Sequence, residues 1–402
     1  MTIGILGGGQ LGYMLALAGY PLGLRFRFLD PSPEAPVGRI AQRVTADFDD
    51  QAALEKFSSG LELVTYEFEN VPVAATKFLS ERVPVYPPPA TLEIAQDRLR
   101  EKALFNKLGI ATTAFAPVHD ANSLDAAVAT VGLPAVLKTS RLGYDGKGQW
   151  TLRTPADVAK VNSEIAASFT NTPSHNAKNA SGETAPFILE RFISFTRELS
   201  ILAVRARSDE VAFYPLVENR HHDGILRLSV APAPSLDPAL QREAEDIARR
   251  VLEALEYVGV LAIEFFECEG RLLANEMAPR VHNSGHWTIE GAITSQFENH
   301  LRAVLDLPLG STKASGFAAM LNLIGETPPA AEVLAIPGAH LHLYGKSPRP
   351  GRKLGHITLC AATFNQLSAS LEALPVYFQR SHFCLSIPGT PPSAHTKHSH
   401  SA

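Results

Sequence analysis

Glu264 and Glu276 each interrupt an apolar run near the middle of the chain. The two runs read as strands joined by a short turn, and a hairpin centred on Gly270 places the two glutamates opposite each other. Facing carboxylates repel unless a cation lies between them, and their oxygens suit Mg²⁺, with Mn²⁺ as an alternative. The pattern predicts a metal site at Glu264 and Glu276, with Asn275 as a further oxygen donor. The alternative is two exposed glutamates on an edge hairpin.

A lysine and a glycine-rich loop predict a polyphosphate site. Lys138 ends an apolar segment, where an amine is unfavourable without an anionic partner. In the loop that follows, glycines free backbone N–H groups to surround phosphates, and a second lysine adds positive charge. The loop consists of Gly143, Tyr144, Asp145, Gly146, Lys147, Gly148 and Gln149. Its spacing is not that of a Walker loop, and the alternative is a plain glycine-rich hairpin.

A loop dense in hydrogen-bond donors, residues 278–287, directly follows the second glutamate strand. Arg280 has the geometry to hold an oxyanion with two N–H groups, and His282 and Asn283 have the polar groups to orient a small substrate. The loop therefore predicts a pocket for a small polar substrate beside the metal site.

A second basic loop lies closer to the C-terminal end and carries Lys346, Arg352 and Lys353 among prolines and glycines. Three cations in a short loop predict a phosphate clamp. A solvated basic loop is the alternative.

The glycine motif GGGQLG at 7–12 follows an apolar strand and opens a helix. Asp30 ends the next strand, where a nicotinamide enzyme holds the ribose of its cofactor. The motif by itself indicates only that backbone approaches an anion at a helix N-terminus. A nicotinamide oxidoreductase, another phosphate ligand and a tight turn without a ligand all remain open at this point.

Alternating strands and helices must position these motifs. Residues 2–6, 25–29 and 61–66 read as strands of a βαβ opening, and prolines between 84 and 89 mark a boundary. The later patterns predict a helix at 91–108, a strand at 134–138, a helix at 237–255, a hairpin at 260–277, a helix at 292–305 and a β-rich end at 317–388. The polar stretch 170–186 predicts a mobile surface insertion, and residues 389–402 predict a disordered tail.

The composition describes a globular enzyme-sized chain. Its 402 residues fit two or three domains, and a net charge of −5 argues against a nucleic-acid partner. Three widely spaced cysteines do not form a disulfide or zinc framework. No apolar run reaches the roughly 20 residues that span a bilayer. We therefore expect a soluble cytoplasmic protein.

Together these motifs resemble the ATP-grasp superfamily and, within it, the N5-carboxyaminoimidazole ribonucleotide synthetases. The resemblance covers most of residues 1–388 and rests on GGGQLG at 7–12, YEFENV at 66–71, QDR at 96–98, GYDGKGQ at 143–149, ERF at 190–192, HHDGI at 221–225, NEMAPRVHNSGHW at 275–287 and PGRKLGH at 350–356. It implies a chain of α/β and α+β class. The implied parts are an N-terminal Rossmann-like domain at 1–90, a central ATP-grasp fold of two subdomains at 91–310 with a mobile lid at about 110–193, and a small C-terminal β-rich domain at 311–388.

The resemblance also implies roles for individual residues. ATP is expected at Arg98, Lys138, Gly143, Tyr144, Asp145, Gly146, Lys147, Gly148, Gln149, Glu190, Arg191, Phe192, Ile193, Glu198, His221, Asn275 and Glu276. The ribonucleotide is expected at Gly9, Gln10, Leu11, Glu67, Tyr144, Arg280, His282, Lys346, Arg352 and Lys353. The implied catalytic group is Arg280, His282, Asn283, Asp145 and Lys138, and Glu264 with Glu276 holds the metal.

The activity that the resemblance implies is the carboxylation of 5-aminoimidazole ribonucleotide in purine biosynthesis. ATP and bicarbonate form carboxyphosphate, and Asp145 and His282 are both candidates to remove the proton from the amine. A homodimer is expected, and a separate mutase must take the product because no mutase domain is fused to the chain. A sister ATP-grasp ligase for another small acid remains open, as does a silent ATP-binding regulator, although the glutamate pair argues against the latter. The resemblance removes the nicotinamide interpretation.

Overall fold

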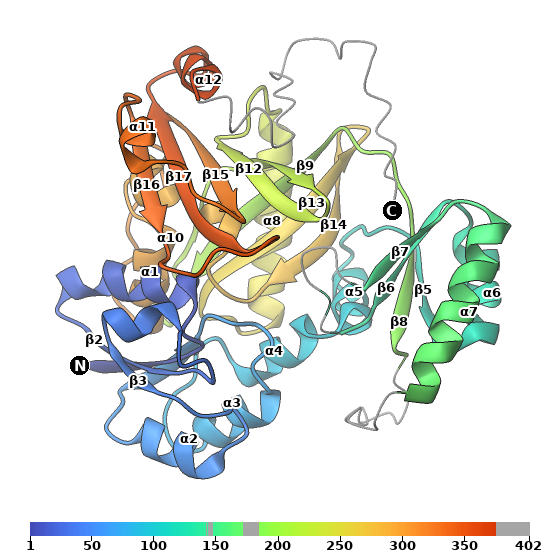
Figure 1. The fold of residues 1–402 in the computed structure, drawn as a ribbon, viewed down its shortest axis with the longest axis horizontal. Coiled ribbons are helices and arrows are strands. Elements are labelled where there is room, and N and C mark those ends of the chain that lie inside the picture. Colours follow the sequence, from blue (N-terminus) through green and yellow to red (C-terminus); the bar gives the residue numbers. More distant parts are fainter. Residues whose placement is uncertain (142, 144–147, 172–184, 375–402) are drawn as a thin grey trace.

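The computed structural model describes residues 1–141, 143, 148–171 and 185–374. The predictions for Tyr144, Asp145, Gly146 and Lys147, for most of the insertion and for the tail concern positions outside the described residues. Within these ranges the strands form sheets of four, nine and four strands, which Figure 1 shows as an N-terminal unit, a central sheet and a smaller unit to one side. In the same ranges no helix is long and apolar enough to cross a membrane.

The N-terminal sheet is parallel, with the strand order β3-β2-β1-β4. Its elements are β1 (Thr2–Leu6), α1 (Gln10–Gly19), η1 (Tyr20–Leu22), β2 (Arg25–Leu29), η2 (Pro36–Arg39), β3 (Gln42–Val44), α2 (Gln51–Ser58), β4 (Leu63–Tyr66) and α3 (Val73–Ser80). Leu6 pairs with Leu29 on one side and with Tyr66 on the other, so three carboxyl ends meet at one edge. The predicted βαβ opening is confirmed, and the glycine motif lies at that edge.

Two helices, rather than the single helix predicted at 91–108, lead to the next unit. They are α4 (Pro89–Ala95) and α5 (Arg98–Lys107). The prediction was wrong because the Asp97 side chain accepts hydrogen bonds from the backbone N–H groups of Leu99 and Arg100, which starts a new helix. This second start gives Arg98 its place in the first turn of α5.

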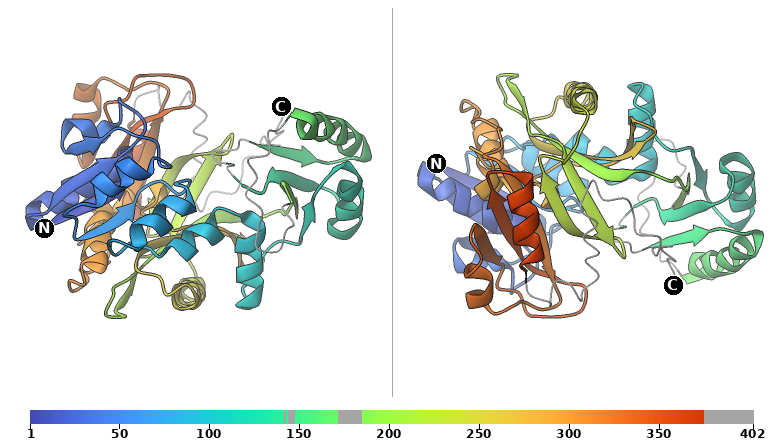
Figure 2. Two further views of the ribbon diagram at one scale, coloured as in Figure 1. Left: turned by 90° about the horizontal axis from the view of Figure 1, so that it is seen from below. Right: turned by 90° about the horizontal axis from the view of Figure 1, so that it is seen from above.

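The smaller unit is an antiparallel sheet with the order β5-β8-β6-β7 and two helices. Its elements are β5 (Phe115–Val118), α6 (Ala121–Val131), β6 (Ala135–Thr139), β7 (Gln149–Leu152), α7 (Pro155–Asn171) and β8 (Phe187–Arg191). Leu124, Leu137 and Leu189 belong to its own buried cluster. Figure 2 shows this unit standing beside the central sheet with its helices on the outer side. We call it the lid unit.

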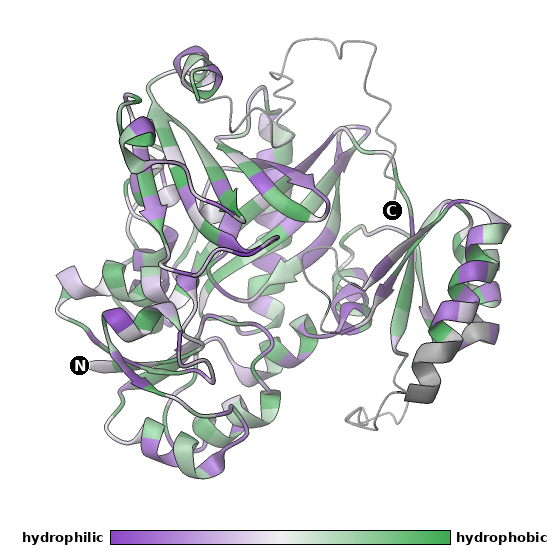
Figure 3. Cartoon of the chain, in the orientation of Figure 1, coloured by the Kyte–Doolittle hydropathy of each residue, from purple (hydrophilic) through white to green (hydrophobic). Residues whose placement is uncertain are grey.

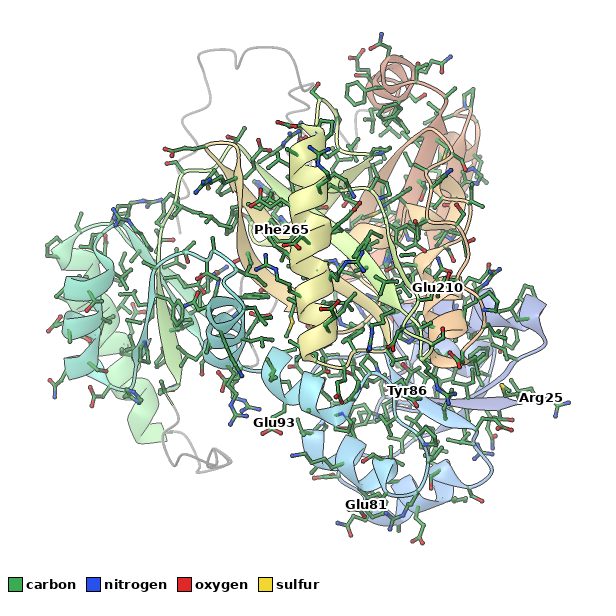
Figure 4. The ribbon with its side chains drawn as sticks, turned by 180° about the vertical axis from the view of Figure 1, so that it is seen from behind. Arg25, Glu81, Tyr86, Glu93, Glu210 and Phe265 are labelled. Carbon is green, nitrogen blue, oxygen red and sulfur yellow. The ribbon has the colours of Figure 1, made fainter. Side chains whose placement is uncertain are left out.

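The central sheet has the order β14-β13-β9-β11-β12-β15-β17-β16 in the described part of the chain, with β10 paired to β9. Its first strands and helix are β9 (Arg197–Arg205), β10 (Val211–Phe213), β11 (Val217–His222), β12 (Ile225–Ala231), α8 (Pro238–Ala254), β13 (Gly259–Cys268) and β14 (Arg271–Ala278). Helix α8 covers one face, where Val251 and Leu252 share a buried cluster with Ile263 and Phe265. Figure 4 shows Phe265 beside this helix.

The C-terminal strands continue this same sheet, because β15 pairs with β12. The remaining elements are η3 (Asn283–Gly285), α9 (Thr288–Gly291), α10 (Gln296–Val304), β15 (Phe317–Ile324), α11 (Ala330–Leu334), β16 (Ala339–Leu343), β17 (Lys353–Ala361) and α12 (Phe364–Glu372). Helix α10 begins four residues later than the predicted 292, because the Ser295 side chain caps it by accepting from Glu298 N–H. Leu301 on α10 packs with Leu15 on α1, which joins the N-terminal unit to the central sheet.

Strand β13 has one face buried under α8 and an opposite, polar face. Ile263 and Phe265 are buried under α8, so the alternating residues Glu264 and Phe266 point to the opposite face. In Figure 3 apolar and polar residues alternate along the central strands in the same way. The polar face of the sheet is therefore where the predicted chemistry gathers.

The hairpin of β13 and β14 brings the two glutamates together by a different route from the predicted one. Cys268 pairs with Arg271, so the turn is the two residues Glu269-Gly270 and is not centred on Gly270. That turn alone would place Glu264 opposite Asn275. A β-bulge in β14 adds one residue and moves Glu276 into the pairing position.

The turn predicts a matched pair of stability changes. Glu269 and Gly270 both have positive φ, at 50° and 75°, which is the conformation of a type I′ turn. Glu269→Asn should raise the free energy of unfolding by about 0.5–1 kcal/mol, because asparagine tolerates this conformation better than glutamate. Gly270→Ala should lower it by about 1–2 kcal/mol. Urea unfolding of both variants measures the effect, and equal values for the two would contradict this description of the turn.

Candidate active site

Glu264 and Glu276 lie directly opposite each other on β13 and β14. Arg98 donates to Glu276 over 2.7 Å, from its Nη1 atom to the Oε2 atom. Burial opposes ionisation of Glu276, but the Arg98 charge outweighs this and lowers the carboxyl pKa. For Glu264, burial and the neighbouring Glu276 raise the carboxyl pKa. Glu276 thus has an arginine partner, whereas ionisation of Glu264 is opposed by the negative charge of Glu276.

Side chains from the first turns of α5 form hydrogen bonds with the backbone of β14 beside Glu276. Glu101 accepts a 2.6 Å hydrogen bond from the backbone N–H of Met277, the residue that follows Glu276. Lys102 is 1% exposed and donates to the Ala274 carbonyl over 3.3 Å. Arg98, Glu101 and Lys102 follow each other at helical spacing, so a single helix contacts β14 at Ala274, Glu276 and Met277.

Lys138 and Lys102 share one carboxylate, that of Glu190. The Glu190 Oε2 atom lies 3.2 Å from the Lys138 amine and 3.5 Å from the Lys102 amine. Burial would raise the pKa of Glu190, but the two lysines and Arg98 lower it to about 2. The Glu190 Oε1 atom is buried and has no partner among the described residues. This carboxylate joins the lid unit, through β6 and β8, to helix α5.

A histidine on β11 carries a positive charge beside the same polar face. His221 Nδ1 lies 2.9 Å from the Glu198 Oε2 atom on β9. Burial alone would lower the pKa of the imidazole, but the bond to Glu198 raises it to about 9. The described part of the site therefore contains a fixed imidazolium near the two strand glutamates, which is suited to an anionic ligand.

The loop after β14 lies over the polar face. Arg280 is paired with Glu69 from the N-terminal unit, with 2.8 Å between Nη2 and Oε2. His282 Nε2 lies 3.5 Å from the Glu264 Oε1 atom. Burial, together with the charge of Arg280, lowers the pKa of this imidazole well below its usual value. Both side-chain polar atoms of Asn283 are buried without a partner among the described residues, so its amide is available to a ligand.

The first glycine motif binds carboxylates of the chain itself. Gly8 N–H donates to Asp30 over 2.6 Å, and Gly9 and Gly12 N–H groups donate to Glu67 over 2.8 and 3.2 Å. These are the N–H groups that the motif offers to a phosphate. Asp30 therefore has a structural partner at the position where a nicotinamide enzyme would present it to a ribose.

A lysine from the C-terminal basic loop reaches this motif. Lys346 Nζ donates to the Gln10 side chain, and the charge of Glu67 lies nearby. Burial lowers the pKa of the Lys346 amine to about 8, a change that nearby Arg352 and Lys353 reinforce and Glu67 opposes. The N-terminal and C-terminal parts therefore contribute to one polar cluster.

The remaining predicted residues differ in how closely they approach these groups. Gln149 pairs with Lys138 across β6 and β7, and Gly148 adopts a φ of 69° beside Thr139. Phe192 is 40% exposed at the end of β8, and Arg352 is held to the Ser347 carbonyl. Leu11 is 7% exposed and belongs to the apolar core. The other predicted positions in the described loop and hinge are Gly143, Arg191 and Ile193.

Four positions in this arrangement were not predicted. Glu69 and Lys102 pair with the predicted residues Arg280 and Glu190, and Glu101 accepts from the backbone beside Glu276. The fourth, Ser284, contacts His282 through its hydroxyl at 2.9 Å. A signal existed for two of them, because Glu101 and Lys102 follow Arg98 at positions that share a helix face. The pairing of Glu69 with Arg280 joins parts more than two hundred residues apart, so local patterns do not reveal it.

The donor set at the hairpin suits a hard cation that has other ligands. Glu264 and Glu276 offer facing carboxylates, and the Asn275 Oδ1 atom is buried without a partner among the described residues. In the described ranges no group of three or more His, Cys, Asp and Glu residues forms a metal site by itself. Two carboxylates that leave coordination positions for phosphate oxygens and water match the binding of Mg²⁺ to nucleotides.

Three family models match the chain in the order of its units. The ribonucleotide synthetase preATP-grasp domain matches residues 1–96, and the ATP-grasp domain matches residues 103–297. The phosphoribosylaminoimidazole carboxylase C-terminal domain matches residues 318–370. The predicted combination of an N-terminal Rossmann-like part, an ATP-grasp part and a β-rich end is confirmed.

Individual proteins match over nearly the whole chain. The N5-carboxyaminoimidazole ribonucleotide synthase of Pseudomonas aeruginosa is 55% identical over 93% of this chain and 99% of its own length. The crystal structure of the synthetase from Thermus thermophilus is 58% identical, covers 92% of this chain and 97% of that one, and has a TM-score of 0.85. The enzyme of Aspergillus clavatus, in complex with ADP and 5-aminoimidazole ribonucleotide, is 30% identical with a TM-score of 0.84 and covers 94% and 98% of the two chains. The chain therefore belongs to the N5-carboxyaminoimidazole ribonucleotide synthase family of ATP-grasp proteins.

Proposed function

We propose that this chain is an ATP-dependent ligase that carboxylates the amine of 5-aminoimidazole ribonucleotide to give N5-carboxyaminoimidazole ribonucleotide. The observation that carries the proposal is the facing pair Glu264 and Glu276, braced by Arg98 and lying beside the 278–287 loop. Relatives in the family bear the name of this activity, and the Aspergillus clavatus structure contains ADP and 5-aminoimidazole ribonucleotide. Bicarbonate is the proposed source of the carboxyl group.

The nucleotide is proposed to bind between the lid unit and the polar face of the central sheet. Lys138 has an ammonium fixed by Glu190, and His221 is held in its charged form by Glu198. Fixed cations of this kind stabilise the charge that develops on a transferred phosphate without needing to reorganise. The unpartnered Oε1 of Glu190 and the adjoining segment to Ile193 are proposed to face the adenine.

Glu264 and Glu276 would hold Mg²⁺ together with the phosphates of ATP. When bound, the ion would neutralise phosphate charge so that an oxygen nucleophile can attack. Glu264 must ionise for this role, and burial together with the charge of Glu276 raises its pKa in the absence of a metal ion. The residues of the chain supply an arginine for one carboxylate and leave the other open to a cation.

The loop after β14 is proposed to hold the bicarbonate. Arg280 supplies positive charge and the free amide of Asn283 supplies a donor and an acceptor. Attack of bicarbonate oxygen on the γ-phosphate gives carboxyphosphate and releases ADP. Because water destroys carboxyphosphate, closure of the lid unit is proposed to exclude solvent. The carboxyl group then passes to the substrate amine with release of inorganic phosphate, and Asp145 is a candidate to receive the amine proton.

The ribonucleotide is proposed to bind where the N-terminal and C-terminal parts meet. Lys346, Arg352 and Lys353 bring positive charge to its phosphate, and the Lys346–Gln10 contact brings that loop to the glycine motif. Because Gly9 and Gly12 already donate to Glu67, we assign the phosphate to the basic side chains rather than to the glycine amides. Glu67 and Gln10 are left to contact the sugar.

The wider setting follows from the reaction. We propose that the chain acts as a cytoplasmic homodimer in purine biosynthesis, where ATP and ribonucleotides are supplied, and that a separate mutase takes the product. The units matched by the family models account for a ligase, and a mutase domain is not among them.

The activity itself predicts a double requirement. Release of inorganic phosphate from ATP should need both bicarbonate and 5-aminoimidazole ribonucleotide, because carboxyphosphate is useful only when an amine can accept the carboxyl group. A coupled phosphate assay with each component omitted in turn measures this. Release with formate or an amino acid in place of these two substrates would instead support a sister ligase.

The glutamate pair predicts the largest single losses of rate. Glu264→Gln and Glu276→Gln should each reduce kcat by about 10²-fold or more, because each removes charge that holds the cation against the transferring phosphate. The double variant should lose much less than the product of the two, since the metal site fails as a unit. Glu269→Gln, on the turn of the same hairpin, is the matched control and should keep the parental rate. Near-parental rates for both single variants at low Mg²⁺ would refute the metal assignment.

The shared carboxylate predicts a pH-dependent loss of stability. Glu190→Gln leaves two lysines without their anion and should lower the free energy of unfolding by about 3–5 kcal/mol at neutral pH. The folded pKa of Glu190, about 2, lies below its unfolded value of about 4.5, so its contribution is complete above pH 4.5 and declines as the pH falls towards 2. The difference between parent and variant in urea unfolding should therefore shrink below pH 4.5. Lys102→Met in the variant background should recover part of the loss, and a difference that stays constant with pH would contradict this pairing.

A further inference from the structure

Four buried side chains form a hydrogen-bonded chain that ends on His282. Ser229 lies 2.7 Å from Asn219 Oδ1, and Asn219 Nδ2 lies 2.8 Å from the Ser200 hydroxyl. The Ser200 and Ser284 hydroxyls are 2.8 Å apart, and Ser284 Oγ is 2.9 Å from His282 Nδ1. The three serines are fully buried and Asn219 is 3% exposed. A fully satisfied polar network of this kind orients the groups that it contacts.

The Ser284 backbone N–H and the Asn219 side-chain amide together indicate the direction of the donors in this network. The N–H of Ser284 donates to His282 Nδ1 over 3.3 Å, as in a capped first turn, so this nitrogen carries a lone pair and no proton. The Ser284 hydroxyl, 2.9 Å from the same nitrogen, must then donate to it as well. Ser284 Oγ is left to accept from Ser200, which in turn accepts from Asn219 Nδ2. All donors therefore point towards the imidazole.

The pairing of neighbouring strands in the central sheet brings the side chains of this hydrogen-bond network together. Ser200 lies opposite Glu264 on the polar face, where β9 pairs with β13, and Asn219 lies opposite Ser229, where β11 pairs with β12. The network thus crosses three neighbouring strands and rises to η3 through Ser284. The imidazole is thereby linked by hydrogen bonds, through Ser284, to side chains from three strands of the central sheet.

We propose that Asn219, Ser200 and Ser284 are positioning residues that hold His282 with its proton on Nε2, so that His282 donates a hydrogen bond to an oxyanion and does not act as a general base. The Nε2 atom lies 3.5 Å from Glu264 Oε1, on the side where the small acid is proposed to bind. An imidazole nitrogen that already carries its proton cannot take another, and the opposite nitrogen is covered by two donors. The role of His282 as an oxyanion donor rests on the proposed function, whereas the assignment of its proton to Nε2 does not.

The proton position is measured on the chain without ligands. In long-range ¹H–¹⁵N spectra of histidine-labelled protein, the signal lost in His282→Gln should show a protonated Nε2 and an unprotonated Nδ1. Asn219→Asp replaces the amide that donates to Ser200 with an oxygen that accepts from it. The second tautomer of His282 should then become populated, so the ¹⁵N chemical shifts of the two ring nitrogens should move towards each other. A protonated Nδ1 in the parent, or spectra unchanged in Asn219→Asp, would overturn the proposal. If Asn219→Asp does not fold, Ser284→Ala, which removes the hydroxyl donor to Nδ1, is expected to cause the same shift.

The donor role is tested by a matched pair of substitutions at His282. Glutamine places an N–H near the position of Nε2, whereas asparagine places its amide near Nδ1. His282→Gln should keep kcat within about tenfold of the parent, and His282→Asn should lose about 10²–10³-fold, the loss typical of an oxyanion donor. Equal, complete losses in both variants would indicate a base and overturn the proposal.

The positioning role predicts an effect on kcat alone. Ser284→Ala should reduce kcat by about 3- to 10-fold, the value of one hydrogen bond, with KM for ATP unchanged, whereas Thr76→Ala, a buried threonine on α3, should leave both constants unchanged. An unchanged kcat in Ser284→Ala would count against the proposal. If the parent itself shows no phosphate release dependent on bicarbonate and the ribonucleotide, the proposed function fails, while the spectra still decide where the proton lies.

Discussion

The pairing of Glu264 with Glu276 holds two carboxylates on adjacent strands, and much of the surrounding structure compensates for their repulsion. Arg98 neutralises one of them, and its position depends on a helix that starts again at Asp97. Glu101 fixes the backbone beside the second strand, and Lys102 holds the same strand through the Ala274 carbonyl. The other carboxylate keeps a raised pKa because it is buried and faces the charge of Glu276. A site with one neutralised and one unneutralised carboxylate selects a ligand that brings positive charge.

The rest of the polar face also contains buried ion pairs, and one of them leaves a carboxylate oxygen without a hydrogen-bond partner among the described residues. One oxygen of Glu190 lies beside two lysine amines, and its second oxygen has no partner among the described residues. His221 and Glu198 form a pair that keeps the imidazole charged. Buried ions contribute little to stability on average, and removing one partner is destabilising. We infer that these ion pairs serve to orient ligands, because apolar residues of similar size would stabilise the fold as well.

Local patterns predicted the strands and the hairpin because they depend on neighbouring residues, and the family assignment made from the motifs is confirmed by the comparisons. The single helix at 91–108 was wrong because one side chain, that of Asp97, outweighed a continuous apolar pattern. The turn residues Glu269-Gly270 and the glutamate pairing were predicted correctly, although the hairpin is not centred on Gly270, because the bulge in β14 cancelled the error in its centre. Contacts between distant segments, such as Glu67 with the glycine amides and Glu69 with Arg280, leave no periodic signal in the sequence. Such contacts decide which of the predicted donors remain available to a ligand.

The polar groups of the site are divided between the central sheet and the lid unit. Glu264, His221 and the chain that ends on His282 all belong to one continuous sheet and the loop fixed upon it. Lys138 and Glu190 belong instead to the lid unit, which meets α5 through Lys102. Groups that must keep their geometry while charge moves are best placed on the sheet, where many backbone bonds would have to break before they shift. Groups that must release a nucleotide are best placed on a unit with its own core and few ionic contacts to the rest. We infer that this division would let the lid unit release the proposed nucleotide while the hydrogen bonds around His282 remain intact.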